Sequence, residues 1–484
     1  MSELVNFNVS AQILDAQGKA EPSRTLWKGT VAIRKEGKTY LKQSLFEKTN
    51  NGQKAYKLRL ENAVLFNQFK TTVNYIQGQI FRKPLMLTYD EDLKQDVVDF
   101  FEVFKEDVDN KNNDWNVFLK TSLKNGLIDG TSYVIVDMPQ FDKTENGQII
   151  IGEKVYPNTI KTLKDFNLRP YWVQIELKDV ISVKIDWING KKEYIEFVYK
   201  QTANVDDNTT KSKYYRYTRD LIQIYSQDDT GKAILEKEIV NKFGFIPVSL
   251  FMCGEPTSDY TALPTLTDLA ELNIAHYNAY SEHQSLMRYD RNPLWLATGV
   301  SALDENGNKV DLVMGPGAGI SASSEADLKS VGVDSQSVIQ SMNDLDKLEK
   351  EMDKYTASMT TSQNMTAEQV DLISGSADCQ IKGWATNFKD FIEDLLCNTA
   401  SIAGLNKTGD EYPRVIVNNE FRKPFDYQQA TLLQDMVAQG QLSLKTYLSI
   451  LKSMSIFDDD FNVDEELEEL GQVSSNNSKE PPEE

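Results

Sequence analysis

The chain of 484 residues contains few of the residues from which metal and thiol sites are built. It has three cysteines, Cys253, Cys379 and Cys397, and two histidines, His276 and His283. Three dispersed cysteines favour reduced thiols in an intracellular assembly over a disulfide framework or a zinc site. A zinc-binding histidine pair on a helix is normally four residues apart, whereas these are seven apart. We therefore expect no metal and no cofactor, and we expect both histidines in a core or an interface.

Long apolar runs and common enzyme motifs are also missing. There is no uninterrupted apolar run of about twenty residues and no basic start followed by an apolar segment, so we expect neither a membrane span nor a secretory signal. The motifs GxxxxGK[ST] and GxSxG do not occur. Gly315, Gly317 and Gly319 lack the Lys-Ser or Lys-Thr pair of a phosphate loop, which favours a mobile loop. We expect a protein without enzymatic activity.

The chain has fewer basic than acidic residues. Fifty-two lysines and arginines against 73 aspartates and glutamates give a net charge of -21, which argues against a general nucleic-acid binder with basic patches. Tyr214, Tyr215 and Tyr217 stand beside basic residues, but the pattern favours alternating strand aromatics over a stacking platform for bases. Acidic pairs such as Asp458 and Asp460 leave a metal-dependent nuclease as an alternative.

Hydrophobic periodicity predicts an α+β fold. Apolar residues recur at helical spacing over three stretches, and a buried strand and a β-rich section with a hairpin at Asn189-Gly190 follow. The segment before them has short alternating patches, such as TVAIRKEGKTYLK, that are typical of edge strands or an extended arm. The predicted helices cover 58–78, 92–108 and 115–130, and the predicted strands cover 131–139 and the section 169–226.

Two long helices are predicted around residues 291–333. The first, within 261–290, has two apolar stripes, so we expect it to need neighbours on two sides and to drive self-association. The predicted oligomerisation residues are Leu269, Leu272, His276, Tyr277, Ala279 and Tyr280. The second helix, 334–359, carries an apolar seam at a repeat close to 3.5 residues, formed by Val338, Met342, Leu345, Leu348, Met352, Tyr355 and Met359.

The second helix leads into TASMTTSQNMT, which has no charged residue. A helix to about Ile402 follows, then a strand and a helical pair at 426–455. The remainder, from Asp458 onward, is acidic and poor in apolar residues, so we expect its end to be disordered.

Three stretches, 55–84, 266–299 and 364–405, resemble the portal proteins of tailed bacteriophages in their extended pattern and order. The likeness extends from about Trp27 to about Ile456 and includes no short diagnostic motif. The resemblance implies a portal-type fold with an α/β wing, a stem of two helices, a small clip, a tunnel loop and a helical crown. Its parts map onto an arm 1–57, wing 58–260, first stem helix 261–290, clip 291–333, second stem helix 334–357, tunnel loop 356–366, kinked wing helix and strand 367–423, crown 424–457 and acidic tail 458–484.

The resemblance also implies a function. Portal proteins form a dodecameric ring at one capsid vertex, through which double-stranded DNA is packaged and ejected. The implied partners are further copies of the chain, the terminase packaging motor, a tail adaptor or head-completion protein, and capsid and scaffolding proteins. The implied place is the virion, after assembly in the host cytoplasm. A capsid-associated scaffold or minor head protein without a DNA channel is the alternative.

The uncharged stretch suits the tunnel loop of such a ring. Lysines at a constriction would make many phosphate contacts with a duplex and hinder its sliding, whereas hydroxyl and amide groups form weaker, exchangeable contacts. The residues expected to face DNA are Thr360, Thr361, Ser362, Gln363 and Asn364. A solvent-exposed connector between helices is the other interpretation of this stretch.

Overall fold

The structure is a computed structural model, and it confirms the α+β class. The chain divides after Val417 into two compact units, Met1–Val417 and Asn418–Glu484. The residues described are 4–139, 142–143, 148–151, 154–156, 168–188, 190–206, 209–227, 232–291, 294–298, 327–331, 334–355, 367–406, 409–418, 427–453 and 461–467.

The first unit begins with helices. A short strand, β1 (Leu4–Val5), pairs with β12 (Ala233–Val240), and α1 (Ala11–Lys28), α2 (Thr30–Glu36) and α3 (Gln53–Asn62) follow. The strand predicted from TVAIRKEGKTYLK is therefore wrong, because this segment forms α2 and a 3-10 turn. Two glycines with positive φ, Gly29 at 87° and Gly37 at 54°, delimit this helix and place Ile33 in the core.

The helix predicted over 58–78 is two helices, α3 and α4 (Gln68–Ile80). The chain leaves the helical conformation at Ala63, and Asn67 starts α4 by accepting a hydrogen bond from the Lys70 N–H at 3.0 Å. The side chain of Asn273 stabilises the connection between α3 and α4, because it accepts a hydrogen bond from the Phe69 N–H and donates one to the Phe66 carbonyl. The apolar residues keep a helical spacing across 58–78, so the pattern alone predicts one continuous helix.

The other predicted helices of this half are present. They are α5 (Gln95–Phe104) and α6 (Trp115–Asp129), with the short strand β2 (Met86–Thr88) before α5. The Asp114 carboxylate caps α6 at 2.7 Å from the Asn116 N–H, and Gly130 ends it in the left-handed conformation. The predicted strand follows as β3 (Thr131–Asp137), which is buried over its first six residues.

Two sheets form the β-rich section. In one, β3 lies between β13 (Val248–Met252) and β7 (Tyr171–Ile175). In the other the order is β1-β12-β11-β10-β9-β8. Its strands β8 (Val180–Ile188) and β9 (Lys191–Asp206) pair with Ile188 opposite Lys191, which confirms the hairpin predicted at Asn189-Gly190. The same sheet contains β10 (Thr209–Thr218) and β11 (Leu221–Gln227). A separate small sheet consists of β4 (Asp142–Lys143), β5 (Ile149–Ile151) and β6 (Lys154–Tyr156).

The tyrosines of β10 pack within the chain. Tyr217 is buried, Tyr215 stacks on Tyr199 with ring centroids 5.0 Å apart, and Tyr214 stacks on Phe7 at 5.1 Å. The interpretation of these residues as alternating strand aromatics is confirmed.

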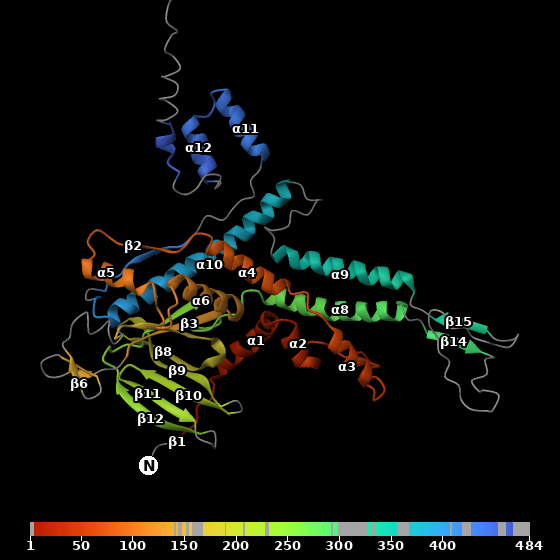
Figure 1. Cartoon of the computed structure of the whole chain (residues 1–484), viewed down its shortest axis with the longest axis horizontal. Helices are drawn as coiled ribbons and strands as arrows, with labels where there is room; N and C mark the ends of the chain where they lie inside the picture. The colour runs from red at the N-terminus through yellow and green to blue at the C-terminus, as the bar shows by residue number, and fades with distance from the viewer. Residues whose placement is uncertain are drawn as a thin grey trace, which may run out of the picture. The chain divides into compact units, whose positions relative to one another are not determined.

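The second half of the first unit is built from long helices (Figure 1). These are α8 (Thr267–Arg291), α9 (Ser335–Tyr355) and α10 (Ala367–Ile402), with strands β14 (Leu294–Thr298) and β15 (Asp327–Val331) between the first two. The strand β16 (Arg414–Ile416) pairs with β2. The second unit contains α11 (Tyr427–Ala438) and α12 (Leu444–Ser453).

One helix, α10, covers the sheet of β3, β7 and β13. Trp172 donates its indole N–H to the Thr399 hydroxyl at 2.8 Å, and Phe251 packs edge-on to Phe388 at 5.1 Å between centroids. These buried contacts fix the second half of α10 to the sheet. Of the helices within the described residues, none is long and apolar enough to span a membrane.

Candidate functional site

The antiparallel pair of α8 and α9 is the feature that best suits a function. Its helices run side by side (Figure 1), and two polar contacts set their register. The Nε2 atom of His276 lies 3.1 Å from Oε1 of Glu349, and Nδ1 of His283 lies 3.1 Å from Oγ of Ser341. From the first contact to the second, the residue number rises by seven on α8 and falls by eight on α9, so the two helices are antiparallel. Both histidines lie in the contact between the helices.

A β-hairpin joins the ends of this pair. The strands β14 and β15 are antiparallel, from Leu294 opposite Val331 to Thr298 opposite Asp327. Figure 1 places the hairpin at the end of α8 and α9 that points away from the two sheets. The segment between the two strands, which includes the predicted loop at Gly315, Gly317 and Gly319, lies outside the described residues.

Helices of the same chain cover α8. Leu269 and Tyr277 are fully buried and His276 is 1% exposed, because α1, α3, α4 and α9 all contact α8. The other predicted oligomerisation residues, Leu272, Ala279 and Tyr280, are half-buried. The residues Leu269, His276 and Tyr277 therefore pack within the chain, whereas Leu272, Ala279 and Tyr280 keep part of their surface open. A role for α8 in assembly remains a prediction.

The apolar seam predicted for α9 is only partly inside the pair. Leu345 and Met352 are buried against the rest of the chain, whereas Met342 is 51% exposed and Tyr355 is 42% exposed. Most of the mixed-charge residues of α9 face solvent, as the ion pair of Lys347 with Asp344 at 3.3 Å illustrates, whereas Glu349 contacts His276. The helix thus keeps apolar side chains on an open, charged surface.

The predicted DNA-facing residues, Thr360 to Asn364, lie outside the described residues. The structure places the ends of that segment, since α9 ends at Tyr355 and α10 begins at Ala367. Asp458 and Asp460, proposed for the nuclease alternative, and the glycines at 315–319 are likewise outside the described part of the chain.

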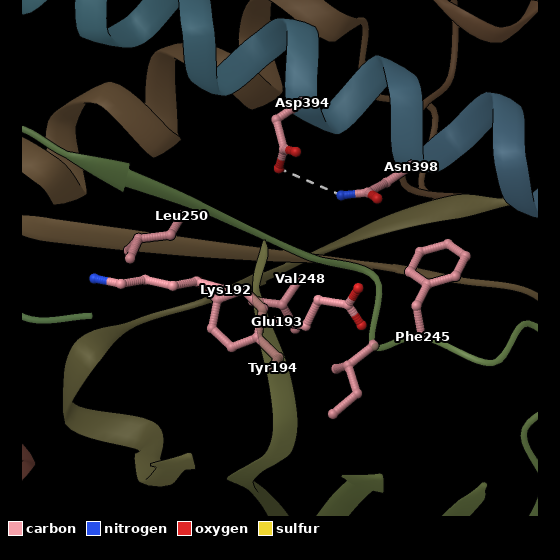
Figure 2. A pocket seen from close by; sticks show the side chains of 9 residues that line it. Lys192, Glu193, Tyr194, Phe245, Val248, Leu250, Asp394 and Asn398 are labelled. Carbon is pink, nitrogen blue, oxygen red and sulfur yellow. Dashed lines mark hydrogen bonds between the residues drawn. The ribbon is translucent and has the colours of Figure 1, made fainter. Parts of the chain in front are cut away.

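A cavity of about 470 Å³ with charged side chains in its wall is a feature that sequence reasoning missed (Figure 2). It lies between the start of β9, the strand β13 and α10, and Asp394 and Asn398 face it from α10. Its lining mixes apolar side chains with two acids, a lysine and an asparagine, and consists of Lys192, Glu193, Tyr194, Phe245, Ile246, Val248, Leu250, Asp394 and Asn398. No sequence motif joins these residues, because they come from three separate segments.

The charges around the cavity are mostly paired. Lys192 forms an ion pair with Asp259 at 2.7 Å, and Glu193 lies 3.5 Å from Arg219. The Asp394 carboxylate accepts from the Asn398 amide at 3.3 Å, and the surrounding protein raises its pKa by displacing water, although its side chain still reaches solvent.

The described cysteine side chains are poorly suited to thiol chemistry. Burial raises the pKa of the Cys253 thiol to about 12 and also raises the pKa of the Cys397 thiol. Both are free thiols, and both stay protonated near neutral pH. Within the described residues, no group of three or more His, Cys, Asp or Glu side chains is arranged to hold a metal ion.

Comparison with known proteins gives one family match and several distant structural likenesses. A family described as "Domain of unknown function (DUF4055)" matches residues 265–401, which include α8, the hairpin, α9 and nearly all of α10. No curated protein matches the chain.

Three of the similar solved structures come from gene transfer agent (GTA) particles. The neck of an empty particle computed with C6 symmetry has 10% identity and a TM-score of 0.44, over 85% of this chain and 96% of that one. The neck of a native particle computed with C12 symmetry has 10% identity and a TM-score of 0.39, over 79% and 89%. The virion of a native particle has 10% identity and a TM-score of 0.38, over 87% and 98%. Likenesses this distant do not assign a function.

Proposed function

We propose that this chain is a structural subunit of a phage-like head-to-tail particle, and that it acts there as a portal protein. Copies would form a closed ring at one capsid vertex, and double-stranded DNA would pass through its central channel. The observation that carries this proposal is the order of α8, hairpin, α9 and α10. A portal stem and clip require two long antiparallel helices joined at one end by a small β element, and the chain contains this arrangement.

In this proposal, α8 and α9 form the stem and the hairpin of β14 and β15 belongs to the clip. The clip would dock the terminase motor during packaging and a tail adaptor or head-completion protein afterwards. Capsid and scaffolding proteins would contact the rest of the first unit. The segment from Thr360 to Asn364 would form the tunnel loop, since it joins the second stem helix to α10.

Single-particle electron microscopy of the purified chain tests the proposal. We expect closed rings of about twelve copies with an open axial hole, and the same particles in the absence of DNA. A scaffold or minor head protein would instead give monomers, small oligomers or particles without a hole. Either of those results would exclude a portal.

We also propose that the chain performs no catalysis and relies on a separate motor for DNA movement. A nuclease assay with supercoiled plasmid and Mg²⁺ is the direct test, with D458N/D460N as the matched control. No cleavage above the buffer blank is expected from either protein. Cleavage by the parent chain that the control variant loses would replace the portal proposal with a metal-dependent nuclease.

A further inference from the structure

Positive charge is concentrated in one small part of this acidic chain, residues 28–62, which we call the basic helical module. It contains nine lysines and arginines and three glutamates, a net charge of +6, which leaves -27 on the other residues. Copies that each carry -21 repel one another, so assembly requires surfaces of opposite sign to meet. The module is the obvious positive partner for such a contact.

Buried contacts hold the second half of the module together. Arg59 donates two hydrogen bonds to the Glu47 carboxylate, each at 2.8 Å, and a further one to the Lys42 carbonyl. The Tyr56 hydroxyl donates to the Leu41 carbonyl at 3.1 Å. These contacts tie α3 to the loop before it, so the outer surface of the module keeps a defined shape.

That outer surface is both basic and apolar. Leu45 is 86% exposed and Phe46 is 58% exposed at the tip of the loop, and Val31 and Leu58 are also exposed. The lysines around them are exposed, and none of Lys35, Lys38, Lys48 and Lys54 pairs with an acid in the part of the chain that the structure describes. Adjacent exposed leucine and phenylalanine side chains favour a protein partner over a phosphate backbone, which lysines alone would satisfy.

A complementary surface exists on α9. Ile339 is 58% exposed, Met342 is 51% exposed, and Asp346 is exposed without an ion-pair partner among the described residues. Spacings of three and four residues place these side chains along one face of the helix, beside the buried seam of Leu345 and Met352. Apolar groups next to a free carboxylate match the exposed leucine, phenylalanine and lysines of the module.

The two surfaces flank the same stretch of α8. Asn278 holds the module, because its side chain accepts from the Lys42 N–H at 2.9 Å and donates to the Tyr40 carbonyl at 2.7 Å. The contacts of α9 with α8, at His276 and His283, lie on either side of Asn278. Figure 1 shows α9 along one side of α8 and the module along the other. In a head-to-tail ring, one surface of each copy contacts a different surface of the next copy. Two surfaces on opposite sides of the same stretch of α8 meet this requirement.

We propose that the basic helical module of one copy docks on the exposed face of α9 of the next copy, with the Leu45–Phe46 tip against Ile339 and Met342 and Lys48 near Asp346. The partner is a second copy of this chain, so the inference rests on the proposed ring and specifies which surfaces close it. It also accounts for apolar side chains on α9 that remain open in a single subunit.

A charge swap tests the contact, with assembly of the full chain followed by native mass spectrometry and sedimentation velocity. At an ionic strength of about 0.05 M, Lys48→Glu and Asp346→Lys should each raise the protein concentration for half-assembly about tenfold. The combined variant should return to within about threefold of the parent. Phe46→Ser should weaken assembly by a similar factor without lowering Tm, because the side chain is largely exposed in one subunit.

Matched controls come from β12, where Lys237 and Val240 are exposed. Lys237→Glu and Val240→Ser should assemble like the parent. Parental assembly of K48E and F46S would overturn the docking contact while leaving a ring-forming portal intact. Loss of assembly in K48E and D346K without recovery in the combined variant would also overturn it. Rings that persist in K48E but lose retention of duplex DNA in a gel shift would identify the module as a DNA surface instead. A parent chain that never assembles would contradict the proposed function itself.

Discussion

Arg24 and Asp129 form a buried ion pair, with Nε of the guanidinium 2.7 Å from Oδ1 of the carboxylate. Both side chains are less than a tenth exposed. The pair joins α1 to the last residue of α6, immediately before the glycine that leads into β3. Burial raises the pKa of Asp129 to about 6, and the Arg24 charge opposes that rise. The carboxylate thus stays ionised near neutral pH with the help of its partner.

Removing Arg24 should therefore destabilise the first unit strongly. Arg24→Met leaves Asp129 buried without a cation, and we expect a loss of about 3–5 kcal/mol in the free energy of unfolding, measured with urea at pH 7. The exposed pair of Lys19 and Asp15 is the control, because Lys19→Met should cost less than about 1 kcal/mol. Equal effects of the two substitutions would mean that the buried pair contributes no more than a surface one.

The Arg59–Glu47 pair should make stability depend on acid pH. Burial alone would raise the pKa of Glu47, but hydrogen bonds from Arg59 and Ser44 outweigh it and hold the pKa below its ordinary value of 4.5. A lowered pKa in the folded state gives a contribution that is present above pH 4.5 and is lost as the pH falls through the folded value. Glu47→Gln should be less stable than the parent at pH 7, and the difference in urea unfolding should shrink as the pH falls below 4.5. A constant difference between pH 3 and pH 7 would contradict this.

Tyr277 should tolerate loss of its hydroxyl but not a charge. Its side chain is fully buried, and its hydroxyl has no hydrogen-bond partner within the described residues. Tyr277→Phe removes that unsatisfied group, so we expect no loss of stability and a gain of up to about 1 kcal/mol. Tyr277→Asp should unfold the subunit rather than only prevent assembly. A folded, monomeric Tyr277→Asp protein, shown by circular dichroism and sedimentation, would instead support Tyr277 as an interface residue.

Gly130 should not accept a side chain. Its φ is +80°, and a Cβ there would lie 2.5 Å from the Leu263 carbonyl oxygen. Gly130→Ala should lower the free energy of unfolding by more than about 2 kcal/mol, since backbone strain and a steric clash add. Gly18→Ala, inside α1 and with nothing within 4 Å of the new methyl group, should instead stabilise the chain by about 0.5–1 kcal/mol. Chemical denaturation of both variants is the measurement, and a stable Gly130→Ala protein would exclude the strained turn.

Lysines in the segment between α9 and α10 should slow DNA packaging. Thr361→Lys with Gln363→Lys would add phosphate contacts, and higher salt should partly restore the packaging rate because screening weakens such contacts. The matching Thr361→Ser and Gln363→Asn chain should package at the parental rate. Parental packaging by the double-lysine chain at low salt would show that this segment does not face the duplex.

The sequence was most informative where local signals agreed with one another. Helix α6 and strand β3 combine a capping aspartate, a closing glycine and a run of β-branched residues, so both were predicted with nearly correct ends. The prediction was wrong at α2, where the residues alternate but few of them are apolar. The segment is helical because a glycine with positive φ stands at each end and Ile33 is buried in the core. Tertiary contacts decided that segment, and they are not visible in its own residues.

Part of the candidate site could likewise be predicted from the sequence, and part could not. Helical spacing was enough to predict α8 and α9. It did not reveal which apolar residues the chain itself covers, such as Tyr277, and which stay exposed, such as Met342. That distinction depends on where α1, α3 and α4 lie around α8, which is a property of the complete fold.

The length of α10 has a mechanical consequence. Its 36 residues form one continuous helix, which at 1.5 Å per residue spans about 54 Å. Its last turns are anchored to the sheet through Thr399 and Phe388, and its first turn directly follows the segment 356–366. A helix of this length is a stiff lever, so a force applied at its start is delivered to the sheet rather than absorbed locally. The position of the first turn of α10 and the position of β13 are therefore coupled over tens of ångströms through a single helix.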